Sequence, residues 1–291
     1  MPRLVRAVLA VLSLAGTVVF AGTTATASAA TRQAGPSGVT AVAAAIANAT
    51  SGTVLWSRDL NTERPMASIT KVMTALVVLR AGGLDNTLTV PSAVTGYVDE
   101  YDASNAGLIP GDRLTVSQLL YAMLLPSGAD AAYTLAQAYG PGLPAFVSKM
   151  NATARALGLT RTHFSNPDGL PYPTGWSDYS TAANLLTLGR VTMAVRAFRQ
   201  IVAVRRYHLA ASAGHHAYTW YNINPLLGYY PGATGVKTGW TPDAGHCLLF
   251  EVRQGGVTLI GVNLDSPGVG STVNGKAATV MLNWAFMQPG A

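Results

Sequence analysis

The chain is poor in charge, in cysteine and in long apolar runs. Charged residues make up 11% of its 291 positions and are scattered along it, so nucleic-acid binding has little support. Cys247 is the only cysteine, which excludes an internal disulfide and predicts a small buried side chain on a strand. Beyond the first thirty residues no apolar run is long enough to cross a membrane, and no segment repeats another.

The first thirty residues have the pattern of an export signal. Arg3 and Arg6 form a basic start, residues 7 to 22 carry no charge, and residues 27 to 29 read Ala-Ser-Ala, a small-x-small cleavage site. We therefore expect residues 1–29 to be a signal peptide, and a mature protein that is secreted or held at the cell wall or the outer face of the membrane. A retained anchor is the alternative. Removing the leader lowers the formal net charge from +6 to +4, because it takes away two arginines and no acid.

A serine and a lysine three residues apart open an apolar, helix-patterned run. Ser68 and Lys71 would lie on one face of such a helix, about one turn apart. A serine hydroxyl becomes a nucleophile when a neighbouring base takes its proton, and lysine is such a base only where burial or another cation lowers its pKa. The pair alone is a weak signal. In a chain with four lysines and 17 serines, some lysine follows a serine by three residues by chance about one time in four. The plain alternative is a serine N-cap with a solvated lysine.

Two further motifs strengthen the hypothesis. Ser127-Gly128-Ala129-Asp130 follows the apolar residues 119 to 126, and Lys237-Thr238-Gly239 is followed by Trp240 and an apolar run. Two of the four lysines therefore lie in motifs. Each motif by itself would more often be a capping loop or a strand edge, and it is their order that favours a catalytic interpretation.

The order of S-x-x-K, a second serine motif and K-T-G resembles that of penicillin-binding proteins and serine β-lactamases. Residues 67 to 75, 166 to 171, 179 to 182 and 235 to 248 are similar to the low-molecular-mass D-alanyl-D-alanine carboxypeptidases of the serine peptidase S11 type. The resemblance covers nearly the whole chain after the leader. It implies an α+β fold, with a mainly antiparallel sheet flanked by helices beside an all-helical lobe.

The residue pattern predicts the same architecture. We expect a sheet lobe from about 38–66 and 200–291 and a helical lobe from about 67–199, within one catalytic domain (30–291) that lacks an additional C-terminal β domain. We expect an opening hairpin in residues 39–58 and strands at 207–218, 244–253 and 257–264. One helix should start near Ser68 and another should end near Leu125. Further helices should cover 130–139, 143–157, 180–190 and 277–287.

The resemblance assigns a role to each motif. Ser68 attacks the carbonyl between two D-alanines of a peptidoglycan stem peptide, Lys71 accepts its proton, and the departing amine is protonated through Ser127. Lys237 and Thr238 hold the terminal carboxylate, beside Gly239 and Trp240. The backbone N–H groups of Ser68 and Trp240 form the oxyanion hole. The expected enzyme is a serine D-Ala-D-Ala carboxypeptidase or DD-transpeptidase, a monomer that needs no metal or cofactor and is acylated by β-lactams.

One position departs from the family pattern. Most relatives have asparagine two residues after the second serine, whose amide contacts the catalytic lysine and the substrate, whereas this chain has Ala129. We expect a site retuned towards transfer onto an amine or towards low activity. The motifs are common to hydrolysis and transpeptidation, so they do not decide whether water or an amine accepts the acyl group.

Two other functions fit parts of the sequence. A β-lactamase of the class most similar in motif order uses a glutamate between the second and third motifs. The three glutamates, Glu63, Glu100 and Glu251, all lie outside that interval. A non-catalytic wall-binding protein would fit Ala129 but not the intact serines and lysines.

His215 and His216 are adjacent, and neighbours on a strand cannot chelate one ion together, so we assign no role to them or to His163, His208 and His246.

Overall fold

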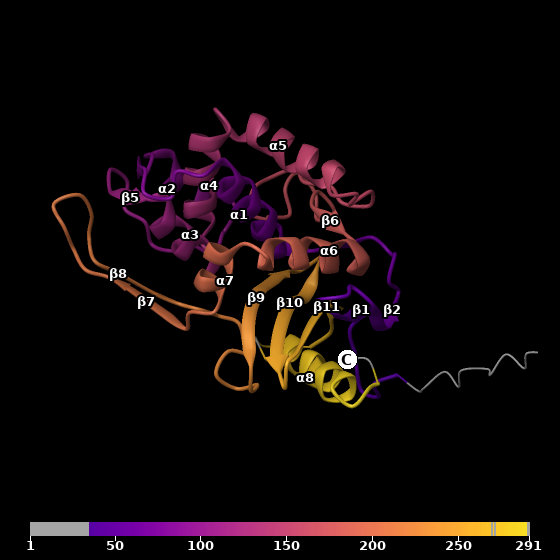
Figure 1. Ribbon diagram of the computed structural model, residues 1–291. Helices are drawn as coiled ribbons and strands as arrows, with labels where there is room; N and C mark the ends of the chain where they lie inside the picture. Colours follow the sequence, from indigo (N-terminus) through magenta and orange to yellow (C-terminus); the bar gives the residue numbers. More distant parts are fainter. Residues whose placement is uncertain (1–34, 269, 271, 290–291) are drawn as a thin grey trace, which may run out of the picture. The chain divides into compact units, whose positions relative to one another are not determined.

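The computed structural model describes residues 35–268, 270 and 272–289, so the expected signal peptide lies outside the described residues. Its centre is a five-stranded antiparallel sheet in the order β2-β1-β11-β10-β9 (Figure 1). The strands are β1 (Ala43–Asn48), β2 (Val54–Arg58), β9 (Ala233–Thr241), β10 (Gly245–Gln254) and β11 (Val257–Ser266). The sheet is thus built from both ends of the described chain, and the opening hairpin expected from the turn residues after Asn48 is confirmed.

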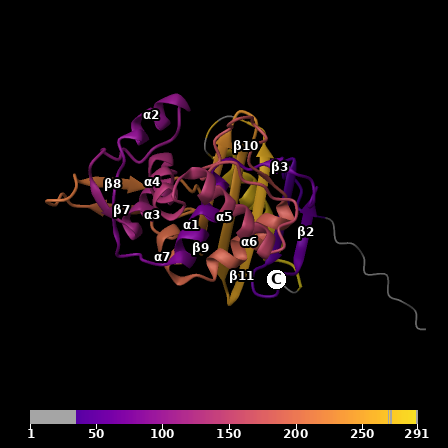
Figure 2. The ribbon, with the colours of Figure 1, turned by 90° about the horizontal axis from the view of Figure 1, so that it is seen from above.

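In the sequence, every described helix except the last lies between the two segments that form the sheet. Figure 2 shows most of the helices from above. They are α1 (Thr70–Ala81), α2 (Ala93–Glu100), α3 (Val116–Leu124), α4 (Ala129–Tyr139), α5 (Leu143–Ala156), α6 (Ala182–Met193), α7 (Arg196–Val202) and α8 (Val273–Ala285). Short two-stranded ribbons are formed by β3 (Arg64–Pro65) with β6 (Tyr179–Ser180), β4 (Thr87–Thr89) with β5 (Arg113–Thr115), and β7 (Arg206–Leu209) with β8 (Tyr218–Tyr221).

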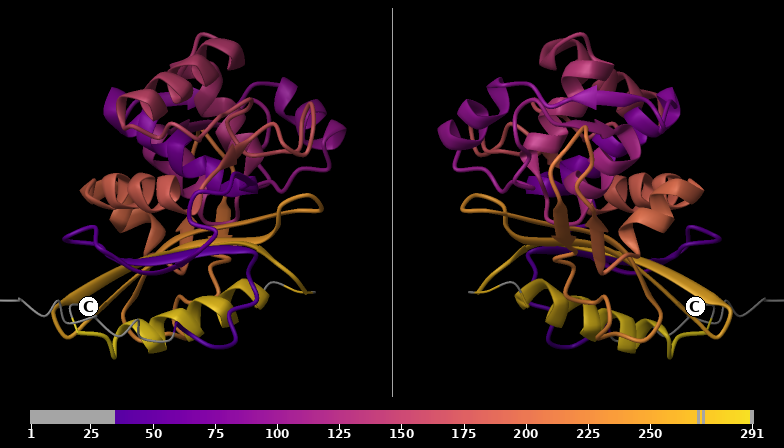
Figure 3. Two further views of the ribbon diagram at one scale, coloured as in Figure 1. Left: turned by 90° about the vertical axis from the view of Figure 1, so that its right-hand side faces the viewer. Right: turned by 90° about the vertical axis from the view of Figure 1, so that its left-hand side faces the viewer.

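Two hydrophobic clusters lie on the two faces of the sheet. One contains Cys247 and Leu249 of β10 and continues into the helices α1, α3, α4 and α6. The other joins Leu248 and Phe250 of β10 to the buried side of α8. Figure 3 shows α8 alone on its side of the sheet and the other helices across it. Cys247 is fully buried on a strand, as its isolation in the sequence predicts.

Local sequence signals explain several boundaries. Thr115 caps α3 by accepting a hydrogen bond from the backbone N–H of Gln118, and the side-chain Oε1 of Gln118 accepts one from the backbone N–H of Thr115. α1 ends at Gly82, which has a φ of 80°, a conformation that glycine adopts without strain. Nine of the twelve residues of α1 are buried, so this helix is the centre of the helical layer. Among the described residues, no helix has the length and apolarity needed to span a bilayer.

The sequence prediction was wrong or incomplete in several places. The expected strand 207–218 is two strands, β7 and β8, joined by an eight-residue connection that carries His215 and His216. The strand that carries Lys237, β9, was not predicted, and neither were the helices α2 and α7. The other predicted helices and the strands β10 and β11 are confirmed within a few residues.

Candidate active site

Ser68 lies in a single 3₁₀ turn, η1 (Ala67–Ile69), directly before α1. The residue before it, Ala67, has a φ of 46°, an uncommon conformation for a residue with a side chain. Lys71 lies in the first turn of α1, and its Nζ donates hydrogen bonds to Ser68 Oγ at 2.9 Å and to the backbone carbonyl of Asp168 at 2.8 Å. Lys71 is 1% exposed. The spacing of three residues therefore brings the predicted base to the predicted nucleophile.

The segment 163–180 fixes the second partner of Lys71. Within it Asn166 Oδ1 accepts a hydrogen bond from the backbone N–H of Gly169 at 2.6 Å. Gly169 has a φ of 83°, and a Cβ at this position would lie 2.0 Å from the Ala67 carbonyl oxygen. Only glycine can therefore bring this loop so close to the turn that holds Ser68. Asp178 also joins this loop to the start of α1, because its carboxylate accepts a hydrogen bond from Thr70 Oγ1 at 3.1 Å.

Burial sets the electrostatics of the site. Loss of solvent lowers the pKa of Lys71 to about 8, although the carboxylates of Asp168, Asp130 and Asp178 oppose the change. Burial also lowers the pKa of Lys237 well below its usual value, and the neighbouring charge of Lys71 lowers it further. Each lysine is therefore easier to deprotonate than a lysine in water.

A tyrosine of α2 holds the loop carboxylate. Tyr97 donates a hydrogen bond from its hydroxyl to Asp168 Oδ2 at 2.9 Å, and its ring contacts Tyr101 and Tyr133. Burial raises the pKa of both Tyr97 and Asp168. Neither Tyr97 nor Asp168 was predicted from the sequence to have a role. The loop around Asp168 carried part of the family resemblance, but α2 gave no signal.

Ser127 lies between α3 and α4, as its motif predicts. It is 3% exposed with a φ of 69°, and its carbonyl accepts a hydrogen bond from Ser104 Oγ at 3.1 Å. Within the described residues its hydroxyl has no hydrogen bond to Ser68, Lys71 or Lys237. Asp130 secures the motif by accepting hydrogen bonds from the backbone N–H groups of Ala106 and Leu108.

The third motif lies on β9, at one edge of the sheet. Lys237 is 1% exposed, and its Nζ donates hydrogen bonds to the carbonyl oxygen of Thr238 at 3.0 Å and to its Oγ1 at 3.3 Å. A Cβ on Gly239 would lie 2.7 Å from the Met66 carbonyl oxygen and 3.1 Å from the backbone nitrogen of Ser68. The absence of a side chain thus lets β9 pass directly beside Ser68. Trp240 follows with 58% of its surface exposed.

Ala129 is the first residue of α4 and is 1% exposed. Its backbone N–H donates a hydrogen bond to the carbonyl of Ser104 at 2.8 Å. A methyl group at this buried position offers neither a donor nor an acceptor.

His215 and His216 lie outside the site, whereas His246 lies opposite Trp240 on β10, with ring centroids 6.2 Å apart. His216 lies in the connection between β7 and β8, where its Nδ1 is 2.9 Å from Asp112 Oδ1, and His215 contacts the carbonyl of His216. No group of three His, Cys, Asp or Glu side chains in the described part of the chain is arranged to hold a metal ion.

The fold and the serine–lysine pair together define the class of acyl-serine enzymes to which penicillin-binding proteins belong. The model of the D-alanyl-D-alanine carboxypeptidase family, peptidase S11, matches residues 26–268. The chain belongs to this family, and the resemblance inferred from its motifs is confirmed.

Individual relatives agree in sequence and structure. The chain is 39% identical to a D-alanyl-D-alanine carboxypeptidase of Streptomyces sp. K15 over 85% of its own length and 88% of the relative's. It is 38% identical to the D-alanyl-D-alanine carboxypeptidase DacB2 of Mycobacterium tuberculosis, over 83% and 80% of the two chains. The crystal structure of the Streptomyces K15 DD-transpeptidase superposes with a TM-score of 0.82 at 38% identity, covering 88% of this chain and all of that one. The predicted fold class is thereby confirmed.

Proposed function

We propose that this protein cleaves the bond between the two terminal D-alanines of peptidoglycan stem peptides through an acyl-enzyme on Ser68. Family membership gives the reaction class, that of the serine D-Ala-D-Ala carboxypeptidases and DD-transpeptidases. The observation that carries the assignment to residues is the 2.9 Å hydrogen bond between Lys71 Nζ and Ser68 Oγ. It joins a hydroxyl to an amine that burial makes easier to deprotonate.

In the proposed acylation, neutral Lys71 takes the proton of Ser68 as Oγ attacks the carbonyl carbon. The negative oxygen that forms is stabilised by the backbone N–H groups of Ser68 and Trp240, each donor lowering the barrier by about 3 kcal/mol. The close approach of Gly239 to the Ser68 nitrogen supports this pairing, because it puts both N–H groups at one junction. The C–N bond then breaks, the proton held by Lys71 passes through Ser127 to the departing D-alanine amine, and an ester remains on Ser68.

Lys237 and Thr238 are proposed to hold the carboxylate of the terminal D-alanine. A charged Lys237 pairs with this carboxylate, and the Thr238 hydroxyl can donate a second hydrogen bond. The exposed indole of Trp240, which follows Gly239 on β9, is proposed to cover the bound peptide. β-Lactams would acylate Ser68 in the same way as the substrate does.

Water or an amine then attacks the ester and releases the acyl group. We propose that Ala129 influences the choice, because a methyl group leaves Lys71 without the amide that most relatives supply. Ala129→Asn should change the ratio of hydrolysis to transfer in the presence of a glycyl acceptor, measured by mass spectrometry of the products. An unchanged ratio and an unchanged acylation rate would show that this position does not tune the site.

The first experiment is labelling with a fluorescent penicillin, followed over hours, with Ser68→Ala as the matched variant. We expect a long-lived adduct on the wild type, no adduct on Ser68→Ala, and release of D-alanine from a stem peptide by the wild type alone. Rapid loss of the label would favour a β-lactamase. No adduct at all would favour a non-catalytic wall-binding protein.

We further propose that the protein is exported with cleavage of residues 1–29 and acts as a monomer at the cell wall. The leader pattern supports export, and the low charge density with a small positive excess is compatible with an anionic wall polymer. N-terminal sequencing of the protein recovered from culture medium and from membranes would test this. A start at Met1 in the membrane fraction would favour a retained anchor.

A further inference from the structure

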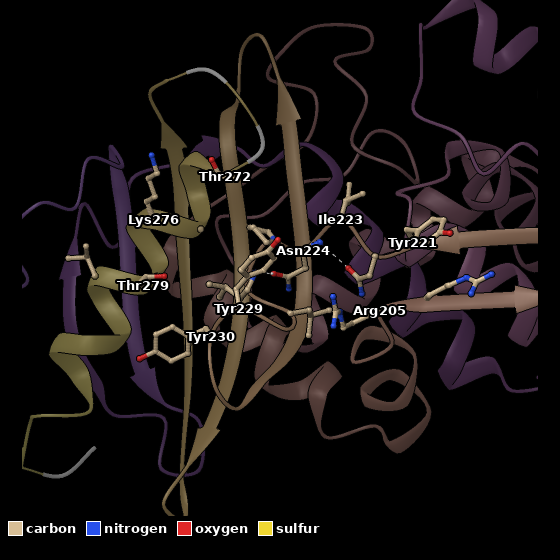
Figure 4. Close-up of a pocket in the computed structure, with 16 residues that line it drawn as sticks. Arg205, Tyr221, Ile223, Asn224, Tyr229, Tyr230, Thr272, Lys276 and Thr279 are labelled. Atoms are coloured by element: carbon tan, nitrogen blue, oxygen red, sulfur yellow. Dashed lines mark hydrogen bonds between the residues drawn. The ribbon is translucent and has the colours of Figure 1, made fainter.

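A large cavity lies on the other side of the sheet from Ser68. Its volume is 1110 Å³, and its walls are one side of α8, the segment 221–230 that leads from β8 towards β9, and Arg205 and Arg206 at the start of β7 (Figure 4). α8 packs on the face of the sheet that carries Leu248 and Phe250, whereas Lys71 belongs with the opposite cluster around α1. This cavity, which we name the α8 cavity, is therefore separate from the proposed active site.

The charges of the α8 cavity have one sign. Arg205, Arg206 and Lys276 line it, and no Asp or Glu is among its lining residues. In the described part of the chain none of the three cations forms an ion pair with a carboxylate. The Arg205 guanidinium lies against Gly228, where a Cβ would be 2.8 Å from Arg205 Cζ. Two arginines and one lysine among the lining residues, without an acid, favour an anion.

The polar floor of the α8 cavity contains an unused donor. Asn224 is 4% exposed, and its Oδ1 accepts a hydrogen bond from the backbone N–H of Leu226 at 3.0 Å. Its Nδ2 has no hydrogen-bond partner among the described residues. A buried N–H without an acceptor is unfavourable. Because this nitrogen is buried beneath the lining, a ligand oxygen would satisfy it after a rotation of the Asn224 side chain towards the α8 cavity.

The rest of the lining is aromatic and aliphatic. Tyr221 and Tyr229 are 60% and 85% exposed, and Ile223 beside them is 48% exposed. Arg206 Cζ lies 5.8 Å from the centre of the Tyr221 ring, a cation–π contact that places the charge beside the ring. These side chains would cover a ring or another apolar group while the cations hold its charge.

We propose that the α8 cavity binds an organic phosphate, that is, a phosphate ester whose organic part is a ring or another apolar group. A phosphate offers more acceptor oxygens and more negative charge than a single carboxylate, so it can engage several of the three cations at once. The arginine fork also matches phosphate oxygens in pairs. Such a ligand can arrive as a free phosphate ester or as the headgroup of an anionic phospholipid.

The test uses phenyl phosphate as the soluble probe, benzoate as the carboxylate control, and vesicles of phosphatidylglycerol or phosphatidylcholine. Arg205→Gln/Lys276→Gln removes two charges from the α8 cavity. Arg80→Gln/Arg155→Gln is the matched control, because it removes two exposed arginines elsewhere. Affinity for phenyl phosphate is measured by calorimetry and vesicle binding by co-sedimentation, and thermal melting verifies that each variant is folded.

We expect phenyl phosphate to bind one site, more tightly than benzoate, with about tenfold or greater loss of affinity in Arg205→Gln/Lys276→Gln and none in the control. Tyr229→Ala, a change at an exposed side chain, should also weaken binding. Binding to phosphatidylglycerol vesicles without binding of phenyl phosphate would identify a lipid headgroup as the ligand. Binding of phenyl phosphate without binding to these vesicles would identify a free phosphate ester. Equal binding by both double variants, equal affinity for benzoate, or no binding of either phosphate would overturn the proposal. Penicillin acylation should be the same in all variants, which separates this result from the proposed function.

Discussion

Acylation should become faster as the pH rises through the pKa of Lys71. The proposed base must be neutral to take the proton of Ser68, and burial brings its pKa to about 8. With that value, about one molecule in eleven has a neutral Lys71 at about pH 7, and about ten in eleven at about pH 9. The rate constant at saturating penicillin should therefore rise about tenfold over this interval and then level off. Rapid-quench labelling with a fluorescent penicillin at a series of pH values measures it.

Lys71→Arg is the control for this experiment. A guanidinium stays protonated at every usable pH, so acylation should be at least about a hundredfold slower and should lose the rise. Loss of the charge on Lys237, whose pKa is also lowered by burial, should appear as weaker penicillin binding and not in this rate constant, because a neutral amine no longer attracts the carboxylate. A rate constant that is flat from about pH 6 to about pH 10, or a normal rise in Lys71→Arg, would refute the assignment of Lys71 as the base.

Three further predictions concern single side chains. Gly239→Ala should reduce penicillin acylation by about a hundredfold or more, because its Cβ would lie 2.7 Å from a backbone oxygen; Gly96→Ala, with open space around its Cβ, should acylate normally, and equal rates in the two variants would contradict the close approach of β9. Tyr97→Phe removes a hydrogen bond from the buried carboxylate of Asp168, so urea unfolding should show a loss of about 1–3 kcal/mol and the pH profile of acylation should shift; an unchanged stability and profile would exclude this positioning role. Thr115→Ala removes the cap of α3 and should cost about 1 kcal/mol of unfolding free energy in the same assay without altering acylation, whereas a neutral result would mean that water replaces the cap.

The serine–lysine pair could be predicted because its geometry is local. Ser68 and Lys71 are three residues apart, so the backbone of a single turn fixes their distance regardless of the rest of the fold. The helix boundaries at Thr115 and Gly82 are local in the same sense, since caps depend on the neighbouring residues.

Features that depend on distant segments could not be predicted. β9 has glycines at 235 and 239 and a buried lysine between them, a composition that is unfavourable for a strand and that makes sense only beside the turn holding Ser68. The proximity of Asp168, Asp178 and Asp130 to Lys71 arises from two segments that are distant from Lys71 in the sequence, the loop 163–180 and the start of α4. The alternating residues 207–218 were read as one strand because their pattern does not show where the chain turns back.

The pairing of β1 with β11, Ala43 opposite Leu264, also has a consequence for how the protein is made. During synthesis β1 leaves the ribosome roughly two hundred residues before its partner, a delay of about 10 to 40 s at usual elongation rates. Throughout that time the first hairpin has an unpaired edge, which is open to pairing with other chains. The nascent protein is therefore expected to depend on holdase chaperones until its last strand is made. Truncations before residue 257 should aggregate even though every proposed catalytic residue is present.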